Sequence, residues 1–428
     1  PEDAMITSYS LDTLVATARQ LSPFYRELYA GLPERPALTQ LPIVDQKAFW
    51  AANTVQGNRL LTGPMTDGIV FKSGGTTGEP KFSVYSRTEW LAFTGAFGMG
   101  LDAGGLRHGD RVANLFYAGE LYSSFIFIMR SLDQAHAGNL QFPLSGRAPA
   151  EQVAQVIADF AVDTLAGAPT TLLNLAAHYI DAGRTAPGLR RLLFGGESLY
   201  ADQRAILERA FPNAATGSVG YASVDAGLLG YADASCAPDE HRAFSRYTLV
   251  EILDDTTGEP IVEAGRVGRV VVTNLTRLLM PIIRYPAGDM ACWVEPEGTP
   301  ERRFRLMGRS EEGARVGPAS LYVEDVRQVL AAFRERLGAV DFQMLVEHVE
   351  SRDRLTLRLA SEVPDAQQPA LTSALVAALL AARPMLADLL EQGMIDAPRI
   401  EWVPLGGLEF NARSGKLKRV IDRRHERR

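Results

Sequence analysis

The chain has 428 residues, of which 46% are hydrophobic and 22% are charged, and its formal net charge is -7. These proportions are typical of a globular protein and exclude a disordered or fibrous chain, and the length allows a large domain plus a smaller one. The negative balance argues against a polyanion bound over the whole surface, so no nucleic-acid partner is expected and the arginine-rich tail is interpreted as a solvated end.

Cysteine usage and hydropathy indicate a compartment. Cys236 and Cys292 lie far apart in the sequence, so no disulfide framework is indicated and a reducing compartment is expected. With His241 they could supply part of a zinc site, but the spacing matches no metal signature; the alternative is a buried thiol and a surface imidazole. The longest apolar stretches are shorter than the roughly 20 residues of a membrane span, and no signal-peptide pattern opens the sequence. We expect a cytoplasmic monomer or homodimer with no membrane partner.

The first informative segment is a glycine- and threonine-rich loop at residues 73–81. Its three glycines let backbone N–H groups turn toward one point, two threonines add hydroxyl donors and a lysine adds a cation, so the loop can wrap a polyphosphate. A P-loop NTPase is disfavoured because Pro80 stands where that motif has glycine. A surface hairpin is the other interpretation. The candidate phosphate-binding residues are Ser73, Gly74, Gly75, Thr76, Thr77, Gly78 and Lys81.

Residues 151–219 alternate between helical and strand-like patterns, which predicts an α/β layered domain. The expected helices are Val153–Phe160, Thr170–Ala182 and Ala201–Ala210, and the expected strands are Val162–Ala166, Leu189–Phe194 and Ala214–Val219. Two β-rich runs follow, Tyr247–Leu253 and Arg269–Thr273, with turn-forming residues after the first, and they predict an antiparallel subdomain.

A third arrangement begins after residue 308, with residues 308–317 as a linker or hinge. The order helix, hairpin, helix, strand predicts a compact α+β unit. Its expected elements are a helix at Val323–Leu337, strands at Phe342–Val349 and Leu355–Ala360 around a turn at 351–353, a helix at Gln368–Leu390 and a strand at Arg399–Val403. The fold class expected is therefore α/β: a large multilayered domain at 1–308 with an antiparallel β subdomain, and a small α+β domain at 309–428.

The loop at 73–81 resembles the signature loop of the AMP-forming acyl-CoA synthetases, nonribosomal adenylation domains and luciferases. Later segments resemble the other motifs of this adenylate-forming superfamily in the same order. Residues 160–170 look like the strand and turn beside the acyl pocket, and Gly195, Gly196 and Glu197 look like the loop that lies along adenine.

Residues 220–225 are similar to the family pattern Tyr-Gly-x-Thr-Glu. The resemblance implies that Tyr221 packs on adenine and that an acid helps to hold Mg²⁺. Three positions depart from the pattern, namely Ala222, Val224 and Asp225. Asp225 still offers a hard oxygen ligand suited to Mg²⁺, but its shorter arm points to a bridging water.

Three further segments complete the resemblance. Residues 284–289 look like Tyr-Arg-Thr-Gly-Asp, which implies that Asp289 accepts hydrogen bonds from both ribose hydroxyls, a task that suits an acceptor-only carboxylate. Residues 308–312 resemble the hinge, with Arg309 near the ribose or phosphate and Glu311 at the pivot. Residues 412–419 are similar to the closing Ser-Gly-Lys loop, so Lys416 is implied as the lysine essential for adenylation.

The resemblance runs from about residue 70 to 425, and the branch most resembled is that of the phenylacetate-CoA ligases. It implies that ATP and Mg²⁺ are used to convert a carboxylic acid, on this branch an aromatic one, into an acyl adenylate that is passed to CoA, with a mobile C-terminal lid carrying Lys416. Transfer to a carrier-protein thiol or an amine, and a non-catalytic nucleotide-binding relative, remain alternatives. The implied acyl-pocket residues, some of which could equally be core, are Phe116, Tyr117, Gly119, Ala168, Ser218 and Gly220.

Overall fold

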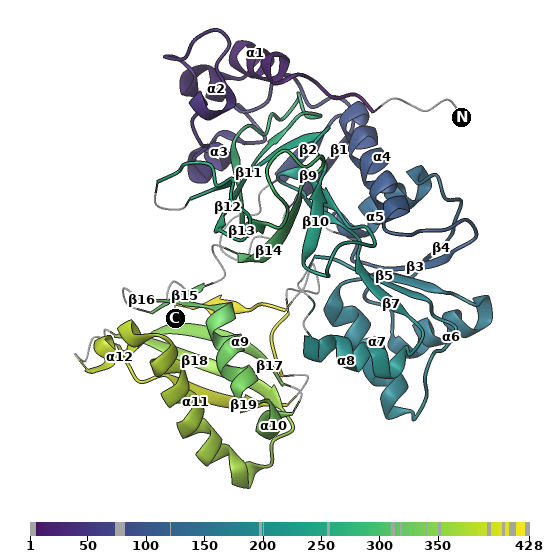
Figure 1. The fold of residues 1–428 in the computed structure, drawn as a ribbon, viewed down its shortest axis with the longest axis vertical. Helices are drawn as coiled ribbons and strands as arrows, with labels where there is room; N and C mark the ends of the chain where they lie inside the picture. Colours follow the sequence, from purple (N-terminus) through teal and green to yellow (C-terminus); the bar gives the residue numbers. More distant parts are fainter. Residues whose placement is uncertain are drawn as a thin grey trace. The chain divides into compact units, whose positions relative to one another are not determined.

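The computed structural model describes residues 6–72, 82–119, 121–196, 199, 201–254, 257–309, 313–316, 319–338, 340–349, 352–391, 395–404, 407–410 and 417–423. The chain divides into two compact units, the first made of residues 1–307 with 413–415 and the second of residues 308–412 with 416–428. The first unit combines a parallel α/β layer with an antiparallel sheet, and the second is a small α+β unit (Figure 1). The expected fold class is confirmed.

The α/β layer of the first unit is a five-stranded parallel sheet in the order β4-β3-β5-β6-β7. Parallel strands need crossover connections, which the intervening helices supply. The predicted alternation over 151–219 is confirmed, with element ends shifted by a few residues. The elements are β3 (Arg111–Leu115), α5 (Ser124–Gln134), β4 (Leu140–Pro143), α6 (Ala150–Phe160), β5 (Thr164–Gly167), α7 (Pro169–Asp181), β6 (Arg191–Phe194), α8 (Ala201–Ala210) and β7 (Ala215–Ser218).

The two faces of this sheet bury different helices, because successive side chains of a strand point to opposite sides. Ala113, Leu165 and Leu192 share one core with the helices α6, α7 and α8. Their sequence neighbours Val112, Ala166 and Leu193 belong to a second core, which includes α4 (Arg87–Ala103) and α5. Both groups of helices are visible on opposite sides of the sheet in Figure 1. Because helices cover both faces of the sheet, most residues of the short central strands are apolar.

The antiparallel part is a seven-stranded sheet in the order β11-β12-β13-β14-β10-β9-β8. The predicted pair is confirmed, with Thr248 opposite Asn274 and Leu253 opposite Arg269. Most of the other strands were not predicted, because they are short or rich in glycine and polar residues. The strands are β8 (Tyr221–Ser223), β9 (Gly227–Tyr231), β10 (Glu240–Ala243), β11 (Thr248–Leu253), β12 (Val267–Asn274), β13 (Tyr285–Trp293) and β14 (Arg303–Arg309).

The N-terminal segment packs against this antiparallel sheet in one continuous core. Its helices begin at side-chain caps: Ser10 accepts from the Thr13 N–H, and Asp45 from the Ala48 N–H. A hairpin of β1 and β2 follows and leads directly into α4. The elements are α1 (Leu11–Leu21), α2 (Pro23–Leu28), the 3₁₀ turn η1 (Leu38–Gln40), α3 (Gln46–Ala52), β1 (Ile69–Lys72) and β2 (Phe82–Tyr85).

The second unit has a four-stranded sheet in the order β19-β18-β17-β20 and a separate hairpin, β15 with β16. β17 and β18 are antiparallel, and each pairs in parallel with the outer strand beside it. Its elements are β15 (Gly313–Val316), β16 (Ala319–Tyr322), α9 (Val323–Ala332), α10 (Arg334–Leu337), β17 (Val340–Val349), β18 (Arg352–Ser361), η2 (Asp365–Gln367), α11 (Gln368–Ala382), α12 (Pro384–Glu391), β19 (Arg399–Val403) and β20 (Val420–Asp422).

Four details of this unit correct the sequence predictions. The predicted helix at 323–337 is two helices, because Phe333 leaves the helical conformation at φ -108 and ψ 12. The predicted helix at 368–390 breaks at Pro384, which lacks an N–H and disfavours the helical conformation of the residue before it. Val349 pairs with Arg352, so Arg352 and Asp353 of the predicted turn at 351–353 belong to β18. The described parts of the predicted linker lie in β14 and β15. No described helix of the chain is long and apolar enough to cross a membrane.

Candidate functional site

The parallel sheet brings several predicted site residues to one edge. Across the sheet, the register pairs Leu115 with Gly167, Gly167 with Phe194, and Phe194 with Ser218. The residues that directly follow these four strands are therefore also neighbours across the sheet. They are Phe116, Ala168, Gly195 and Val219. Ligands of open α/β sheets bind outside the carboxyl ends of the strands, so this row is the natural floor of a binding site.

Gly195 is a closely packed position where a side chain would force its neighbours to shift. A Cβ added there would lie 2.6 Å from Val219 Cγ2 and 3.6 Å from Phe116 Cζ. The next residue, Gly196, has φ +80, in the region that favours glycine. The backbone thus leaves β6 without side chains at these two positions, and Val219 and Phe116 fill the Cβ side of Gly195.

The two aromatic residues after β3 have different environments. Phe116 is 5% exposed and belongs to the core between the sheet and α4. Tyr117 is half-buried, and its hydroxyl lies 3.2 Å from Thr171 Oγ1 in the first turn of α7. Its ring covers Gly146, where an added Cβ would lie 2.7 Å from Tyr117 Cε2. Tyr117 therefore offers a ring surface at the strand end, while Phe116 forms a wall beneath Gly195.

The chain passes from the parallel sheet to the antiparallel sheet between Ser218 and Tyr221. Gly220 makes the passage at φ +121, and a Cβ on it would lie 2.9 Å from the Phe97 ring. The Gly220 N–H donates to Ser218 Oγ at 3.0 Å. Ser218, a predicted acyl-pocket residue, and Tyr221, a predicted adenine-binding residue, therefore lie on the two sides of one tight turn.

His241 lies beneath this turn, and the surface location expected for it is wrong. Its side chain is buried, with Nε2 2.9 Å from Ser218 Oγ. The imidazole, Tyr221 and Phe304 form a cluster of three rings, with centroids 5.7 Å (His241–Tyr221), 6.0 Å (His241–Phe304) and 6.0 Å (Tyr221–Phe304) apart. Burial lowers the pKa of His241 to about 4, so the imidazole is neutral at neutral pH. Among the described residues no group of three His, Cys, Asp or Glu side chains could hold a metal ion, which leaves the zinc alternative without support.

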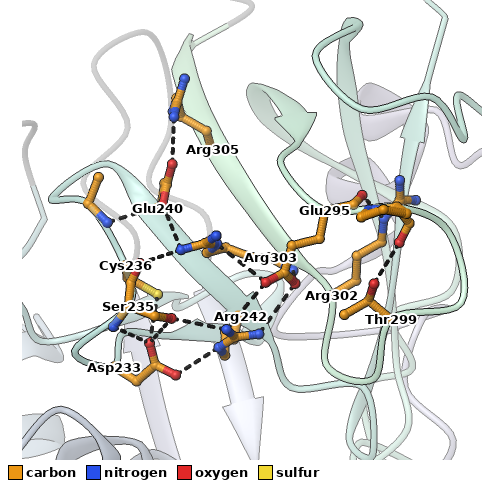
Figure 2. Close-up of polar contacts among 12 residues, drawn as sticks. Asp233, Ser235, Cys236, Glu240, Arg242, Glu295, Thr299, Arg302, Arg303 and Arg305 are labelled. Carbon is orange, nitrogen blue, oxygen red and sulfur yellow. Dashed lines mark hydrogen bonds and ion pairs between the residues drawn. The ribbon is translucent and has the colours of Figure 1, made fainter.

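A salt-bridge network fixes the strand that carries His241 (Figure 2). Glu240 and Arg242 flank the histidine on β10, and alternation puts them on the opposite face. Arg242 Nε donates to Asp233 Oδ2 at 2.7 Å, and Arg305 Nη2 lies 2.6 Å from Glu240 Oε1. Burial opposes ionisation of Asp233, but hydrogen bonds from Ser235 and Arg242 lower its pKa to about 2. Arg242, Arg303 and Arg305 are each paired with an acid, which makes the network a structural tie between β10 and its neighbours.

Tyr221 and Asp289 come together from β8 and β13, and the Tyr221 hydroxyl donates to Asp289 Oδ2. Asp289 lies in a β-bulge: Arg269 pairs with Met290 and Val271 with Pro286, so extra residues of β13 face one residue of β12. Gly288 adopts φ +83 within the bulge. A bulge re-aims side chains, and here it presents a half-buried carboxylate beside the Tyr221 ring.

The backbone around Asp225 is held by three side chains. Each donates a hydrogen bond to one of three consecutive carbonyl oxygens. Tyr85 Oη donates to the Val224 oxygen at 2.8 Å, Arg277 Nη1 to the Asp225 oxygen at 2.9 Å, and Asn274 Nδ2 to the Ala226 oxygen at 3.1 Å. The Asp225 side chain is half-buried. The backbone that carries this carboxylate is therefore fixed in position.

Several predicted site residues lie outside the described part of the chain. They are Ser73, Gly74, Gly75, Thr76, Thr77, Gly78, Lys81, Glu197, Glu311 and Lys416. Arg309 is the last residue of β14. The strands on either side of residues 73–81 pair in an antiparallel manner, with Lys72 opposite Phe82.

The roles of Arg277 and Glu89 and the burial of His241 were not predicted from the sequence. Arg277 is a single charge within the largely apolar stretch 270–283, and that interruption was a usable signal. Glu89 follows Ser86 by three residues, which is the spacing of a capping box. Glu89 Oε1 also accepts hydrogen bonds from the N–H groups of Leu278 and Leu279, both at 2.7 Å. No local pattern marks His241 as buried.

The chain is similar to proteins that are named AMP-binding enzymes or coenzyme A ligases. A family model described as AMP-binding enzyme matches residues 69–276. A phenylacetate-coenzyme A ligase of Thermus thermophilus is 24% identical over 97% of this chain and 95% of that protein. A phenylacetate-coenzyme A ligase of Pseudomonas putida is 26% identical over 68% of this chain and 66% of that protein. The solved structure of 2-hydroxyisobutyryl-CoA ligase with 2-HIB-AMP, in the postadenylation state, has a TM-score of 0.70 at 20% identity, covering 96% of this chain and 88% of that one.

Proposed function

We propose a defined reaction for this chain, which belongs to the adenylate-forming superfamily and is an AMP-forming ligase similar to the phenylacetate-CoA ligases. The resemblance seen in the sequence motifs is confirmed by these relatives. In the proposed reaction, ATP and an aromatic carboxylic acid give an acyl adenylate and pyrophosphate, and CoA then takes the acyl group. The observation that carries the proposal is the convergence of Gly195, Ser218 and the Tyr221–Asp289 pair around the carboxyl edge of the parallel sheet.

The nucleoside half of ATP fits the described residues. We propose that a flat base lies along the backbone of Gly195 and Gly196, which carry no side chains; the Cβ side of Gly195 is itself packed against Val219 and Phe116. The Asp289 carboxylate is an acceptor-only group suited to the two ribose hydroxyls. The Tyr221 hydroxyl orients that carboxylate and leaves its ring to pack on the base. We propose that Arg309 and Glu197 complete this half of the site.

A magnesium ion also fits the donor set. Mg²⁺ in nucleotide sites is held by one or two carboxylates together with phosphate oxygens and waters, not by a cage of protein ligands. Asp225 offers one such carboxylate on a fixed backbone, and no described cluster of three acidic or imidazole groups competes for the ion. When bound, Mg²⁺ neutralises charge on the phosphate oxygens.

The chemical step is attack of a carboxylate oxygen on the α-phosphorus, with the P–O bond to pyrophosphate breaking. Both reactants are anionic, so binding must hold them together and offset the charge that builds in the transition state. We assign Thr76, Thr77 and Lys81 to the β- and γ-phosphates and Lys416 to the carboxylate and α-phosphate. These assignments rest on the sequence resemblance.

The acceptor step is proposed to need a second arrangement of the two units. The candidate ATP residues up to Asp289 belong to the first unit, whereas Lys416 belongs to the second. We place the pivot at Glu311, so that the second unit first presents Lys416 and then presents another face to the incoming thiol. The thiolate attacks the acyl carbon, and AMP is the leaving group.

An aromatic acid is the substrate class we propose. Tyr117 presents a ring at the end of β3, and Phe116 walls the same region below Gly195. Ala168 and Ser218 lie at the ends of the neighbouring strands and are buried, and the Ser218 hydroxyl is bonded to His241 and to the Gly220 N–H. The side chains at these strand ends are largely apolar, which suits a ring better than a long charged chain.

A screen that monitors AMP and pyrophosphate over aryl and alkyl acids tests the proposal. We expect arylacetic and other aryl acids to give both products, and added CoA to give the thioester. Parallel reactions with a carrier-protein thiol and with amines test the alternative acceptors. Release of ADP, or ATP binding without pyrophosphate exchange for any acid, would contradict adenylation. Lys416→Ala should nearly abolish acid-dependent exchange, and unchanged exchange would refute its role.

A further inference from the structure

The Ser218 hydroxyl lies at the centre of a small hydrogen-bonded group in the turn between the two sheets. Its Oγ accepts from the Gly220 N–H at 3.0 Å and lies 3.4 Å from the Gly220 carbonyl oxygen, so it contacts both polar backbone groups of that glycine. His241 Nε2 lies 2.9 Å from the same Oγ. The hydroxyl therefore has three neighbours: a backbone donor, a backbone acceptor and an imidazole nitrogen.

The surroundings of His241 decide which of its ring nitrogens carries the hydrogen. A neutral imidazole has one N–H, on either Nδ1 or Nε2. Within the described part of the chain, the buried Nδ1 has no hydrogen-bond partner. A hydrogen on Nδ1 would leave a buried N–H without an acceptor, which folded proteins rarely tolerate. A hydrogen on Nε2 is donated to Ser218 Oγ, and the hydroxyl hydrogen can then turn to the Gly220 carbonyl oxygen.

The glycine that the Ser218 hydroxyl contacts is closely enclosed. Gly220 adopts φ +121, a backbone conformation that other residues rarely adopt. A Cβ added to it would lie 2.9 Å from the Phe97 ring of α4 and 3.1 Å from the Gly230 carbonyl oxygen of β9. Packing thus limits the Cβ side of the turn, while Ser218, with His241 behind it, engages the backbone groups of the same residue.

His241 also contacts the far end of the turn. Its ring packs against Tyr221 and Phe304, whose own centroids lie 6.0 Å apart. The Tyr221 hydroxyl donates to Asp289 Oδ2. One imidazole therefore holds the start of the turn through Ser218 and its end through the Tyr221 ring.

The residues proposed to bind the nucleoside adjoin this turn. Tyr221 and Asp289 meet at its end, and Val219 within it packs against the Cβ side of Gly195. His241 is only 4% exposed and stands behind these residues. A buried imidazole with one unpaired nitrogen is a costlier way to fill a core than an apolar side chain of similar volume. The hydrogen bond to Ser218 is what an apolar side chain could not supply.

We propose that His241 is a positioning residue for the nucleotide: it donates its Nε2 hydrogen to Ser218 and packs on Tyr221, and so holds the Tyr221 ring in place for the base. This inference rests on the proposed function, because it takes Tyr221 and Asp289 as contacts of the nucleoside. Nucleotide affinity, and not stability alone, then depends on the hydrogen bond between His241 and Ser218.

The first test measures the protonated nitrogen of His241 by two-bond proton–nitrogen NMR correlation on the full chain labelled with ¹⁵N-histidine. The chain has six histidines, and the signal that is lost in His241→Gln identifies this one. We expect a neutral ring with its hydrogen on Nε2. A hydrogen on Nδ1 would overturn the inference.

The second test measures AMP affinity by isothermal titration calorimetry. His241→Phe keeps a ring but removes the donor, and Ser218→Ala removes the acceptor. Each should weaken AMP binding about three- to tenfold, the range of one hydrogen bond. Because both remove the same bond, the double variant should lose little more than either single variant. His241→Gln, which keeps an N–H donor, should recover part of the loss.

Ser22→Ala is the matched control for Ser218→Ala. The Ser22 hydroxyl is also buried, accepts from the Tyr25 N–H and donates to the Arg59 carbonyl oxygen, but it lies in the N-terminal segment. It should leave AMP affinity unchanged.

Unchanged AMP affinity in Ser218→Ala, or losses that simply add in the double variant, would overturn the inference. If His241→Phe fails to fold, Ser218→Ala and the NMR measurement still decide the question. Failure of the wild-type chain to bind AMP would instead overturn the proposed function.

Discussion

Ser218 and His241 are joined by a hydrogen bond of 2.9 Å across 23 residues of sequence, and they belong to two different sheets. The bond ties the end of β7 in the parallel sheet to β10 in the antiparallel sheet. The buried imidazole also packs against the rings of Tyr221 and Phe304, so it contacts both ends of the segment 218–221.

The first prediction concerns acid stability. The pKa of His241 falls from 6.5 to about 4 on folding, because burial disfavours the imidazolium. The unfolded chain therefore takes up a proton first, so this contribution to stability is complete above pH 6.5 and is lost as the pH falls toward 4. The full effect is about 3 kcal/mol. Urea unfolding between pH 4.5 and 7.5 measures it.

Two variants control that experiment. His241→Gln keeps a polar group for Ser218 but cannot titrate, and it should flatten the pH dependence of the free energy of unfolding. His108→Gln removes an exposed imidazole and should leave the dependence as in the wild type. An unchanged slope in His241→Gln would contradict the buried neutral state.

The second prediction concerns nucleotide binding at the bulge of β13. Asp289→Asn replaces one acceptor oxygen by a donor, and the affinity for both ATP and AMP should fall by about ten- to a hundredfold. Tyr221→Phe keeps the ring but no longer orients the carboxylate, so a smaller loss is expected. Calorimetric titration with AMP measures both. Wild-type AMP affinity in Asp289→Asn would remove Asp289 from the ribose site.

The third prediction concerns close packing at the end of β6. Gly195→Ala places a methyl group 2.6 Å from Val219 Cγ2, and the forced shift should cost about 1–3 kcal/mol of stability and reduce nucleotide affinity. Gly217→Ala is the matched control on β7, because a Cβ there meets no atom within 4 Å. Thermal unfolding and AMP titration of both variants give the comparison. Equal behaviour of the two would show that the backbone at Gly195 adjusts freely.

The fourth prediction concerns the buried pair of Arg284 and Glu251, whose Nη2 and Oε1 atoms lie 2.9 Å apart. Burial raises the pKa of Glu251 and the arginine partly offsets that rise. Glu251→Gln leaves the buried guanidinium without a carboxylate and should cost about 3–5 kcal/mol in urea unfolding. Glu27→Gln removes an exposed partner of Arg59 and should cost less than about 1 kcal/mol. Similar small losses in both would mean that the buried pair contributes little.

Local regularities made part of this fold predictable. The alternation over 151–219 fixes helix and strand identity because each element must bury one face, and α8 has the predicted bounds Ala201–Ala210. Where a local breaker was overlooked, the prediction was wrong: Pro384 divides the helix expected at 368–390. β9, in contrast, carries no clear period-2 pattern, and its place in the sheet depends on its neighbours.

The sequence by itself indicated the resemblance to a family, the alternation of elements over 151–219 and the chemical types of the proposed site residues, because these depend on motifs and periodicities within short segments. Only the tertiary structure decided that Tyr221 meets Asp289, that His241 is buried against Ser218, and that Arg277 joins Val84 to Asp225. Each of these contacts links segments far apart in the chain. Such contacts depend on strand order, a bulge and the packing of two sheets, and no spacing within a local motif encodes them.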